Sequence, residues 1–336
     1  VQETIAAART GQPLPLIAQQ VRFAQLARED GTVDGDARHA FTKEPGLIAV
    51  ANGDRPASEL APQIASCYRH FRQSYGGRPN CPPELQAAID TLPDGMPAPL
   101  DGPLAGKVVL VTGAGRRVGR AIAEELGEAG AAVVVHYFGA RAEAAQVAAR
   151  IPRSLVIRAD LRTVDGCRTL MDTVRQHMGR LDALVNNAAV YKRGPFAYES
   201  EKTWEELLAL NLLAPARLLR HALALGCTSC VNIVDVAAHK PWRHHAAYAT
   251  SKAALAHLTR CLALELSPAV RVNAVAPGTV AFPPEFSEAE RAAIIARVPL
   301  GRTGGPADVA RAVRYLLESD YISGVVLPVD GGASLV

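Results

Sequence analysis

The chain has 336 residues, of which 49% are hydrophobic and 21% are charged, and its formal net charge is +3. This mixture is typical of a folded globular protein and excludes a mainly disordered chain. The longest apolar runs, 108–111 and 131–135, are far shorter than the roughly 20 residues of a membrane-spanning helix, and the small net charge gives no argument for nucleic acid as a partner.

The N-terminal region, residues 1–91, carries no motif for a metal, a phosphate or a nucleophile, and its role stays unassigned. Its apolar residues predict helices at 14–28, 60–75 and 83–91, with apolar stripes that are typical of packing or docking surfaces. The six cysteines of the chain do not make a disulfide scaffold, so we expect reduced thiols in a cytoplasmic protein, and the first residues do not resemble a signal peptide. A linker rich in proline and glycine follows at 92–103.

Beyond residue 103, short apolar runs alternate with helical segments, which is the signature of βαβ units on a parallel sheet. We expect helices at 118–129 and 140–150. The expected strands are 107–111, 132–137, 154–159, 183–185, 230–234, 270–274 and 325–328. The sequence therefore predicts an α/β domain over residues 104–336 with a Rossmann-type, doubly wound parallel sheet of seven strands, preceded by a mainly helical N-terminal extension.

A glycine-rich turn joins the first expected strand to its helix. The run from Thr112 to Gly119 reads TGAGRRVG. Glycines such as Gly113 let the backbone turn tightly and let a diphosphate approach the N-terminus of the helix. Because Val118 stands where the dinucleotide-binding fingerprint has its third glycine, a plain tight turn is the alternative interpretation.

The residues after the second expected strand distinguish between the two nicotinamide cofactors. An NAD enzyme normally has Asp or Glu there to bind the ribose 2′-hydroxyl. The chain instead reads VHYFGAR over 135–141, without an acid, and Arg116 and Arg117 lie in the glycine-rich turn. Cations without a facing carboxylate suit a 2′-phosphate, so the sequence favours NADP(H). The alternative is that both arginines only face solvent.

Tyr248 and Lys252 stand four residues apart, on one face of an expected helix. A phenol with its ordinary pKa of about 10 is a poor acid–base group at neutral pH, and a cation beside it favours the phenolate. The pair is therefore a candidate for proton transfer. Because this spacing is common, an ordinary surface pair is the alternative.

Several motifs in residues 104–336 resemble the short-chain dehydrogenase/reductase family in their order and spacing. They are the turn Thr112–Gly119, Asp160, the run Asn186-Asn187-Ala188-Ala189, Asn211, the pair Tyr248 and Lys252, Pro277-Gly278, and Asp330-Gly331-Gly332. The resemblance implies a nicotinamide cofactor and a small-molecule substrate. It also implies a homodimer or homotetramer that meets through the helix carrying Lys252, although packing within one chain is the alternative for that helix.

Within this family, Asp235 resembles the pteridine reductase branch. It lies thirteen residues before Tyr248, at the usual place of a catalytic serine. Arg117, the pair His136-Tyr137 and the run 211–215 resemble the same branch. A carboxyl at this place can accept a hydrogen bond from the amino edge of a pterin or assist Tyr248 in supplying a proton. A ketone reductase more often needs a hydroxyl donor there.

The resemblance implies that NADPH gives a hydride to a dihydropterin or dihydrofolate while Tyr248, with Asp235 behind it, supplies the proton. Lys252 would hold the nicotinamide ribose, and Asn211 would anchor a water that links Lys252 to solvent. The implied cofactor contacts are Gly113, Arg116, Arg117, Val118, Gly119, His136, Tyr137, Asp160, Leu161, Asn187, Ala188, Ala189, Tyr248, Lys252, Pro277, Gly278 and Thr279. The implied substrate contacts are Arg117, Ala189, Tyr191, Asp235 and Tyr248, with the ring of Tyr191 stacking on the pterin.

Some features depart from this pattern or leave it open. Ala189 and Val190 replace small hydroxyl residues of the family's site. The basic and aromatic loop 239–245 and a lid at 279–298 are expected specificity elements, although the loop could be ordinary surface. The cysteines at 227 and 230 lack the further ligands that zinc needs, so we expect no metal. The alternative functions are a generic carbonyl or 3-oxoacyl reductase and a catalytically silent, NADP-binding regulatory protein.

Overall fold

The computed structural model describes residues 102–280, 282 and 286–336. The helices expected at 14–28, 60–75 and 83–91, and most of the expected linker, lie outside the described residues. Within the described part of the chain, none of the helices is both long and apolar enough to cross a membrane.

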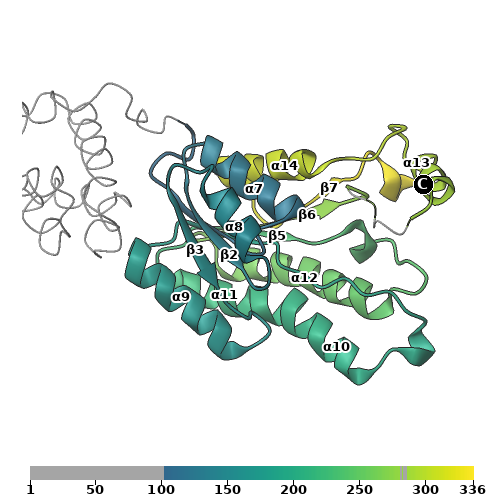
Figure 1. The fold of residues 1–336 in the computed structure, drawn as a ribbon, viewed down its shortest axis with the longest axis horizontal. Coiled ribbons are helices and arrows are strands. Elements are labelled where there is room, and N and C mark those ends of the chain that lie inside the picture. Colours follow the sequence, from purple (N-terminus) through teal and green to yellow (C-terminus); the bar gives the residue numbers. More distant parts are fainter. Residues whose placement is uncertain (1–101, 281, 283–285) are drawn as a thin grey trace, which may run out of the picture. The chain divides into compact units, whose positions relative to one another are not determined.

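Seven parallel strands form one sheet in the order β3-β2-β1-β4-β5-β6-β7 (Figure 1). Strands β1, β2, β4 and β5 are buried along their whole length. This burial on both faces explains the apolar run of β1 and the apolar runs that begin β2 and β4. The predicted doubly wound α/β fold is confirmed, with strand ends shifted by three residues at most. The strands are β1 Val108–Val111, β2 Ala132–Tyr137, β3 Ser154–Arg158, β4 Ala183–Asn186, β5 Ser229–Ile233, β6 Arg271–Pro277 and β7 Val326–Val329.

Helices cover both faces of the sheet. Figure 1 shows α7, α8 and α14 on one face and α9, α11 and α12 on the other. The helices are α7 Arg117–Glu128, α8 Arg141–Ala148, α9 Val164–Met178, α10 Glu201–Leu208, α11 Ala214–Leu223, α12 Ala246–Glu265, α13 Glu288–Ile295 and α14 Pro306–Glu318. Three short 3₁₀ turns are η1 Phe196–Tyr198, η3 Val236–Ala238 and η4 Ala333–Leu335.

A π-helical segment, η2 Ala209–Leu213, joins α10 to α11 without an intervening loop. Its cause lies in the sequence, because Pro215 has no N–H to donate to the carbonyl of Asn211 four residues earlier. The helix widens there instead of continuing its regular hydrogen bonds. Such segments are frequent at functional sites, and this one holds Asn211 in the interior.

The parallel strands bring distant parts of the chain to one edge of the sheet. The strand order reverses where β1 lies between β2 and β4, and open α/β sheets bind ligands beyond the carboxyl ends of their strands at that point. The segments that leave this edge are 112–119, 187–191, 234–245 and 278–280. They contain most of the residues that the sequence singled out.

Candidate active site

The hydroxyl of Tyr248 donates a hydrogen bond of 2.8 Å to Oδ2 of Asp235. Tyr248 lies in the first turn of α12, and Asp235 follows β5. The other carboxylate oxygen, Oδ1, accepts a bond of 2.8 Å from the backbone N–H of Ala237 and so caps η3. Both oxygens of Asp235 are engaged, which fixes the carboxylate against the Tyr248 hydroxyl. The structure thus brings together the two residues that the sequence placed thirteen positions apart.

The electrostatics of this pair differ from the sequence expectation. Burial raises the pKa of Tyr248 well above its ordinary value, and the charge and hydrogen bond of Asp235 raise it further. Burial also raises the pKa of Asp235, against its hydrogen bonds and the charge of Lys252. In this structure the group bonded to Tyr248 is the carboxylate of Asp235 rather than the ammonium of Lys252, so an effect of the cation on the phenolate stays a prediction. The hydroxyl keeps its proton at neutral pH and is a proton donor.

Lys252 lies one turn along α12 from Tyr248, and its side chain is buried. Its ammonium donates a hydrogen bond of 2.8 Å to the carbonyl of Ile233, the last residue of β5. Burial lowers the pKa of Lys252 to about 8, although the charge of Asp235 opposes the shift. The hydrogen bond to β5 therefore fixes the position of the ammonium. Its pKa of about 8 means that the group loses its proton only slightly above neutral pH.

Asn211 connects the π-helical segment to the loop after β4. Its side-chain oxygen accepts from the N–H of Val190 at 2.9 Å, and its amide nitrogen donates to the Val190 carbonyl at 3.0 Å. The same nitrogen donates to Oγ of Ser251 at 3.0 Å. Asn211 therefore holds the backbone beside Ala189 against α12. The water link from Asn211 to Lys252 stays a prediction.

The glycine-rich turn packs directly on the segment after β4. The Asn187 amide donates to the carbonyls of Thr112 and Gly113 at 2.8 and 3.2 Å, and Oγ1 of Thr112 accepts from the N–H groups of Asn187 and Ala188. A Cβ on Gly119 would lie 2.2 Å from the Gly113 carbonyl oxygen and 2.4 Å from the Asn187 amide. The helix therefore approaches the glycine-rich turn closely at Gly119. This glycine stands one residue after Val118, which replaces the third glycine of the fingerprint.

The N-terminus of α7 fits an anionic group. Among the described residues, none caps this helix with a side-chain hydrogen bond, and its first turn carries no acid. The N–H groups of the first turn are therefore available to an anion. Arg117 has φ of 50°, a left-handed conformation that is uncommon for a residue with a Cβ. A free helix end, a cation and a turn without room for side chains together fit the diphosphate of a dinucleotide.

His136 does not present its side chain to a cofactor. The ring is 2% exposed, its Nδ1 accepts from the N–H of Gly113, and its Nε2 donates to the carbonyl of Ala159, both at 3.1 Å. Burial lowers the pKa of His136 to about 4, so the ring is neutral. The neighbouring Tyr137 is buried too. His136 therefore braces the glycine-rich turn, and the cofactor contacts of this pair stay a prediction.

Arg116 was expected to face no carboxylate, but the structure places one beside it. Nε of Arg116 donates to Oε1 of Glu143 at 2.7 Å, and the two side chains form an exposed ion pair. Glu143 lies on α8 rather than at the end of β2, so the residues directly after the second strand give no sign of this carboxylate. In contrast, Arg117 makes no ion pair within the part of the chain that the structure describes.

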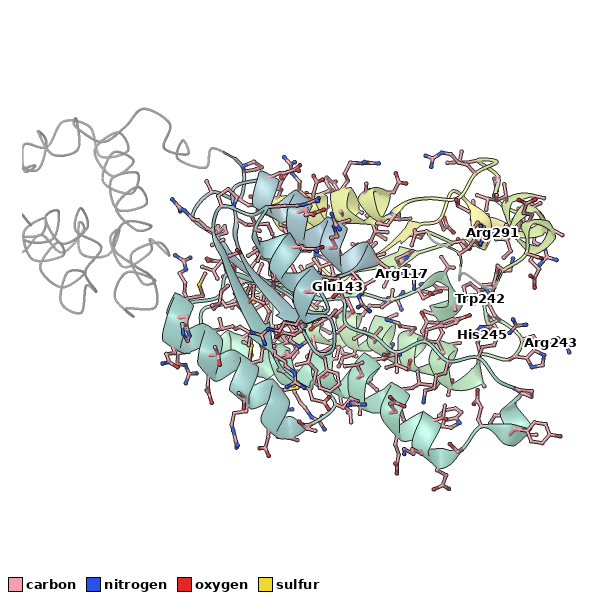
Figure 2. All side chains as sticks on the ribbon, in the orientation of Figure 1. Arg117, Glu143, Trp242, Arg243, His245 and Arg291 are labelled. Atoms are coloured by element: carbon pink, nitrogen blue, oxygen red, sulfur yellow. The ribbon has the colours of Figure 1, made fainter. Side chains whose placement is uncertain are left out.

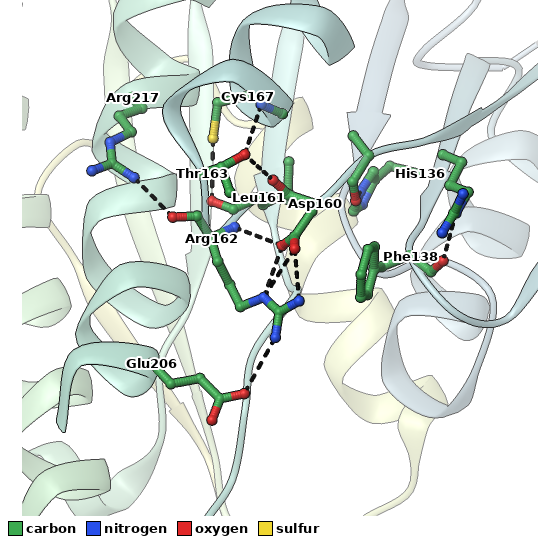
Figure 3. Close-up of polar contacts among 12 residues, drawn as sticks. His136, Phe138, Asp160, Leu161, Arg162, Thr163, Cys167, Glu206 and Arg217 are labelled. Atoms are coloured by element: carbon green, nitrogen blue, oxygen red, sulfur yellow. Dashed lines mark hydrogen bonds and ion pairs between the residues drawn. The ribbon is translucent and has the colours of Figure 1, made fainter. Parts of the chain in front are cut away.

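Asp160 follows β3 as expected, but Arg162 already holds it. The guanidinium of Arg162 donates to both Asp160 oxygens, at 2.9 Å from Nε and 2.6 Å from Nη2, and also approaches Glu206 at 3.5 Å (Figure 3). These bonds hold the pKa of Asp160 below its usual range. Glu206 is also hydrogen-bonded by Lys192. A cofactor that contacts Asp160 would therefore have to share the carboxylate with Arg162. The sequence analysis did not predict this pairing.

Tyr191 lies beside the catalytic candidates, as expected for a substrate contact. Its ring meets the ring of Tyr248 edge-on, with centroids 5.0 Å apart and an interplanar angle of 76°. Its hydroxyl lies 2.6 Å from Nε2 of His245. Figure 2 shows His245 with Trp242 and Arg243 on the segment that leads into α12. His245 was not predicted individually, although its place three residues before Tyr248 was a usable signal.

The other predicted positions are placed as follows. Leu161 is buried after β3, and the N–H of Gly278 donates to the carbonyl of Val329 just beyond β6. Part of the expected lid at 279–298 lies outside the described residues, and the remainder contains α13. Burial raises the pKa of Cys227 to about 12 and that of Cys230 well above its usual value, so both thiols stay protonated.

Known proteins share this domain. The sequence profile of the family described as enoyl-(acyl carrier protein) reductase matches residues 113–334. A Streptomyces violaceoruber protein named as ketoacyl reductase 2 of the granaticin polyketide synthase is 38% identical over 240 residues, which are 68% of this chain and 96% of that protein. The 3-oxoacyl-[acyl-carrier-protein] reductase FabG of Pseudomonas aeruginosa is 34% identical over 242 residues, 68% of this chain and 98% of that protein.

Two solved structures extend the comparison. The angucycline C-6 ketoreductase LanV with bound NADP superposes with a TM-score of 0.66 at 31% identity, covering 70% of this chain and 98% of that one. FolM alternative dihydrofolate reductase 1 from Brucella canis, complexed with NADP, has the same TM-score and identity over 69% of this chain and 96% of its own. From these matches, the fold and the ordered motifs, the chain belongs to the short-chain dehydrogenase/reductase family.

Proposed function

We propose that the chain is an NADPH-dependent reductase of a pteridine, of dihydropterin or dihydrofolate type, in which Tyr248 supplies the proton. The observation that carries this proposal is the partly buried hydrogen bond of 2.8 Å from the Tyr248 hydroxyl to Asp235. Where most family members place a serine hydroxyl, this chain places a carboxyl that accepts from the tyrosine. A pteridine is reduced at a ring C=N bond, which needs a proton on nitrogen and presents amino groups that a carboxyl can bind.

NADP(H) is the proposed cofactor. The free end of α7, the glycine-rich turn and the cation of Arg117 supply its diphosphate and phosphate contacts. Both solved neighbours described above hold NADP. When bound, NADPH supplies the hydride. Lys252, fixed by the Ile233 carbonyl, is proposed to hold the nicotinamide ribose.

The pair of Tyr248 and Asp235 acts as one acid. The raised pKa values of both groups keep a proton between them at neutral pH. In the forward reaction the Tyr248 Oη–H bond breaks, and its proton passes to the ring nitrogen as the hydride reaches the adjacent carbon. The ammonium of Lys252 lies close enough to lower the pKa of Asp235, so it stabilises the negative charge that the pair gains.

A carbonyl or 3-oxoacyl reductase is the second candidate function. It is favoured by the relatives named as ketoacyl and 3-oxoacyl reductases and by the ketoreductase structure. In this candidate the protonated pair donates to a carbonyl oxygen. A silent, NADP-binding regulatory protein is less consistent with the site, because Tyr248, Asp235 and Lys252 are all held in place by hydrogen bonds.

A substrate panel tests the proposal. NADPH oxidation is measured with dihydrobiopterin, dihydromonapterin, dihydrofolate and acetoacetyl esters. We expect kcat/KM to be higher for at least one pteridine than for any ester. Turnover of the esters alone would favour the second candidate, and turnover of neither class, with NADPH still bound, would favour a regulatory protein. Light scattering on the same preparation tests the proposed homodimer or homotetramer.

A further inference from the structure

We propose that His245 is a positioning residue that fixes the ring of Tyr191 as a wall of the substrate site, and that this wall selects planar ring substrates over acyclic ones. The proposal rests on the proposed reductase function and assigns a role to a residue outside the family motifs quoted above. It follows from the hydrogen bonds, ring geometry and exposure of four side chains.

The hydrogen bonds of His245 fix its donor and acceptor roles. Its Nδ1 lies 2.8 Å from the carbonyl oxygen of Arg243, and a carbonyl can only accept, so Nδ1 carries the hydrogen. In the neutral ring the other nitrogen, Nε2, is then an acceptor. Nε2 lies 2.6 Å from the Tyr191 hydroxyl, which donates to it. The imidazole is 7% exposed, so these two bonds account for its polar atoms in a place with little water.

The Tyr191 ring connects this bond to the reacting groups. One edge meets Tyr248, whose hydroxyl is bonded to Asp235, and the hydroxyl end meets His245. Tyr191 is nevertheless 50% exposed, in contrast to Tyr248 at 6%. An aromatic ring held at two places and half open to solvent offers its surface to a ligand beside the Tyr248 hydroxyl. A ring that is half exposed is not held in place by core packing, so its two contacts are what fix it.

The same contact ties together two loops that leave the sheet from different strands. The N–H of Gly194, after β4, donates to the carbonyl of His244, after β5, at 2.9 Å. Trp242 stands edge-on to His245, with ring centroids 5.7 Å apart at 84°, and is 36% exposed. Tyr191, His245 and Trp242 therefore form one aromatic surface, which Figure 2 lets the reader follow at the labelled His245 and Trp242.

A rigid aromatic surface favours a flat ligand for two reasons. A planar ring gains stacking or edge contacts that a flexible chain cannot make. A wall that is already fixed also loses less conformational entropy when the ligand binds. Ala189 and Val190, at the start of the same loop, offer no side-chain hydroxyl, so shape rather than side-chain hydrogen bonding dominates on this side.

The test uses the full chain and a double-mutant cycle. Tyr191→Phe removes only the hydroxyl from a half-exposed ring, and His245→Phe removes the acceptor while keeping a ring of similar size. KM and kcat are measured for dihydrobiopterin, for α-tetralone as a planar ketone, and for ethyl acetoacetate as an acyclic one. Oxidised biopterin binding to the protein with NADP⁺ is read from quenching of tryptophan fluorescence. His245→Gln, which restores a side-chain acceptor, is the rescue variant.

We expect each single variant to raise KM for the planar substrates and the biopterin Kd by about 3- to 10-fold, the range for one lost hydrogen bond, with a smaller effect on ethyl acetoacetate. The double variant should add little to either single one, and His245→Gln should recover part of the loss. Additive effects, or equal changes for planar and acyclic substrates, would overturn the proposal. If the wild-type protein reduces α-tetralone but none of the pteridines, the pteridine function is rejected. The KM for α-tetralone and the Kd for biopterin in the variants would still decide the role of His245.

Discussion

Asp235 is the residue at which this site differs from a site with the usual serine. One carboxylate oxygen caps η3, and the other accepts a hydrogen bond from Tyr248. Serine is also a good cap, so Asp235→Ser preserves the local fold while it replaces the carboxyl with a hydroxyl. A substitution at this position can therefore distinguish pteridine reduction from carbonyl reduction without a large loss of stability.

We predict that Asp235→Ser lowers kcat for a dihydropterin by about 100-fold or more, because the supporting half of the acid is lost. The ratio of ketone to pterin turnover should rise. Asp235→Asn is the matched control, since it keeps the shape and removes the charge that raises the pKa of Tyr248. Steady-state rates from pH 5 to 10 provide the measurement, and unchanged pterin turnover in Asp235→Ser would reject the assigned role.

Lys252 gives a pH dependence with opposite signs for activity and stability. Its pKa of about 8 means that the cation is lost as pH rises through 8, so kcat/KM should fall above that pH. In the unfolded chain the same lysine keeps its proton until about pH 10.4. The unfolded state therefore binds more protons between these values, and the free energy of unfolding rises with pH in that window.

The measurement compares wild type with Lys252→Met by chemical unfolding from pH 7 to 10. Relative to the variant, the wild-type protein should gain about 2 kcal/mol between pH 8 and 10. A constant difference across the range would contradict the burial of a titrating lysine. The alkaline fall in kcat/KM is read from the wild-type protein in the same buffers.

At the scale of elements, the glycine-rich turn and the loop after β4 act as one unit. Asn187 and Thr112 bond the two segments together, and Gly119 lets them approach. A methyl group on Gly119 would meet the backbone oxygen of Gly113, which a side-chain rotation cannot relieve.

We predict that Gly119→Ala destabilises the fold by about 1–3 kcal/mol through overpacking and weakens NADPH binding by at least tenfold. Gly139→Ala is the control, because a Cβ there meets no heavy atom within 4 Å. Thermal unfolding and NADPH fluorescence titration are the measurements. Equal Tm values and equal Kd values for the two variants would show that the close approach at Gly119 does not matter.

The elements show which parts of the fold were predictable. Strand β1 and most of β2 were predictable because burial on both faces produces apolar runs, whereas β3 and β7 are only partly buried. The π-helical segment was not found, because its signal is a single proline whose effect depends on the surrounding helix. The burial of the His136 ring could not be predicted, because a polar residue at a strand end is typical of a ligand contact and only the packing reveals where its ring lies. Motif spacing anticipated that Tyr248 and Asp235 lie together, because one stands in the first turn of α12 and the other just after β5, while their catalytic roles stay a prediction.

The pairings of Glu143, Arg162 and His245 could not be predicted for a shared reason. Glu143 meets Arg116, His245 meets Tyr191, and Arg162 meets Glu206 as well as its near neighbour Asp160, so each takes part in a contact between segments from different strands or helices. Sequence order gives no distance between such segments. The sequence therefore predicted the backbone positions of the site better than its charges.

At the scale of the whole molecule, the site exists only because the sheet places the ends of several strands at one edge. Gly113, Asn187, Asp235 and Tyr248 are spread over more than a hundred residues, and the strand order brings their segments together. The described fold is the same as that of reductases with different substrates. Substrate choice is therefore expected to depend on the loops rather than on the sheet, and we propose that Asp235 and His245 contribute to it.

The central claim is that Tyr248 donates the proton in an NADPH-dependent reduction, and Tyr248→Phe tests it most directly. The substitution keeps the ring and removes the hydroxyl that is bonded to Asp235. We predict that kcat falls by about 100- to 10,000-fold with the best substrate of the panel, while the Kd for NADPH changes by less than about twofold. A Tyr248→Phe variant that binds NADPH and keeps wild-type turnover would contradict the claim.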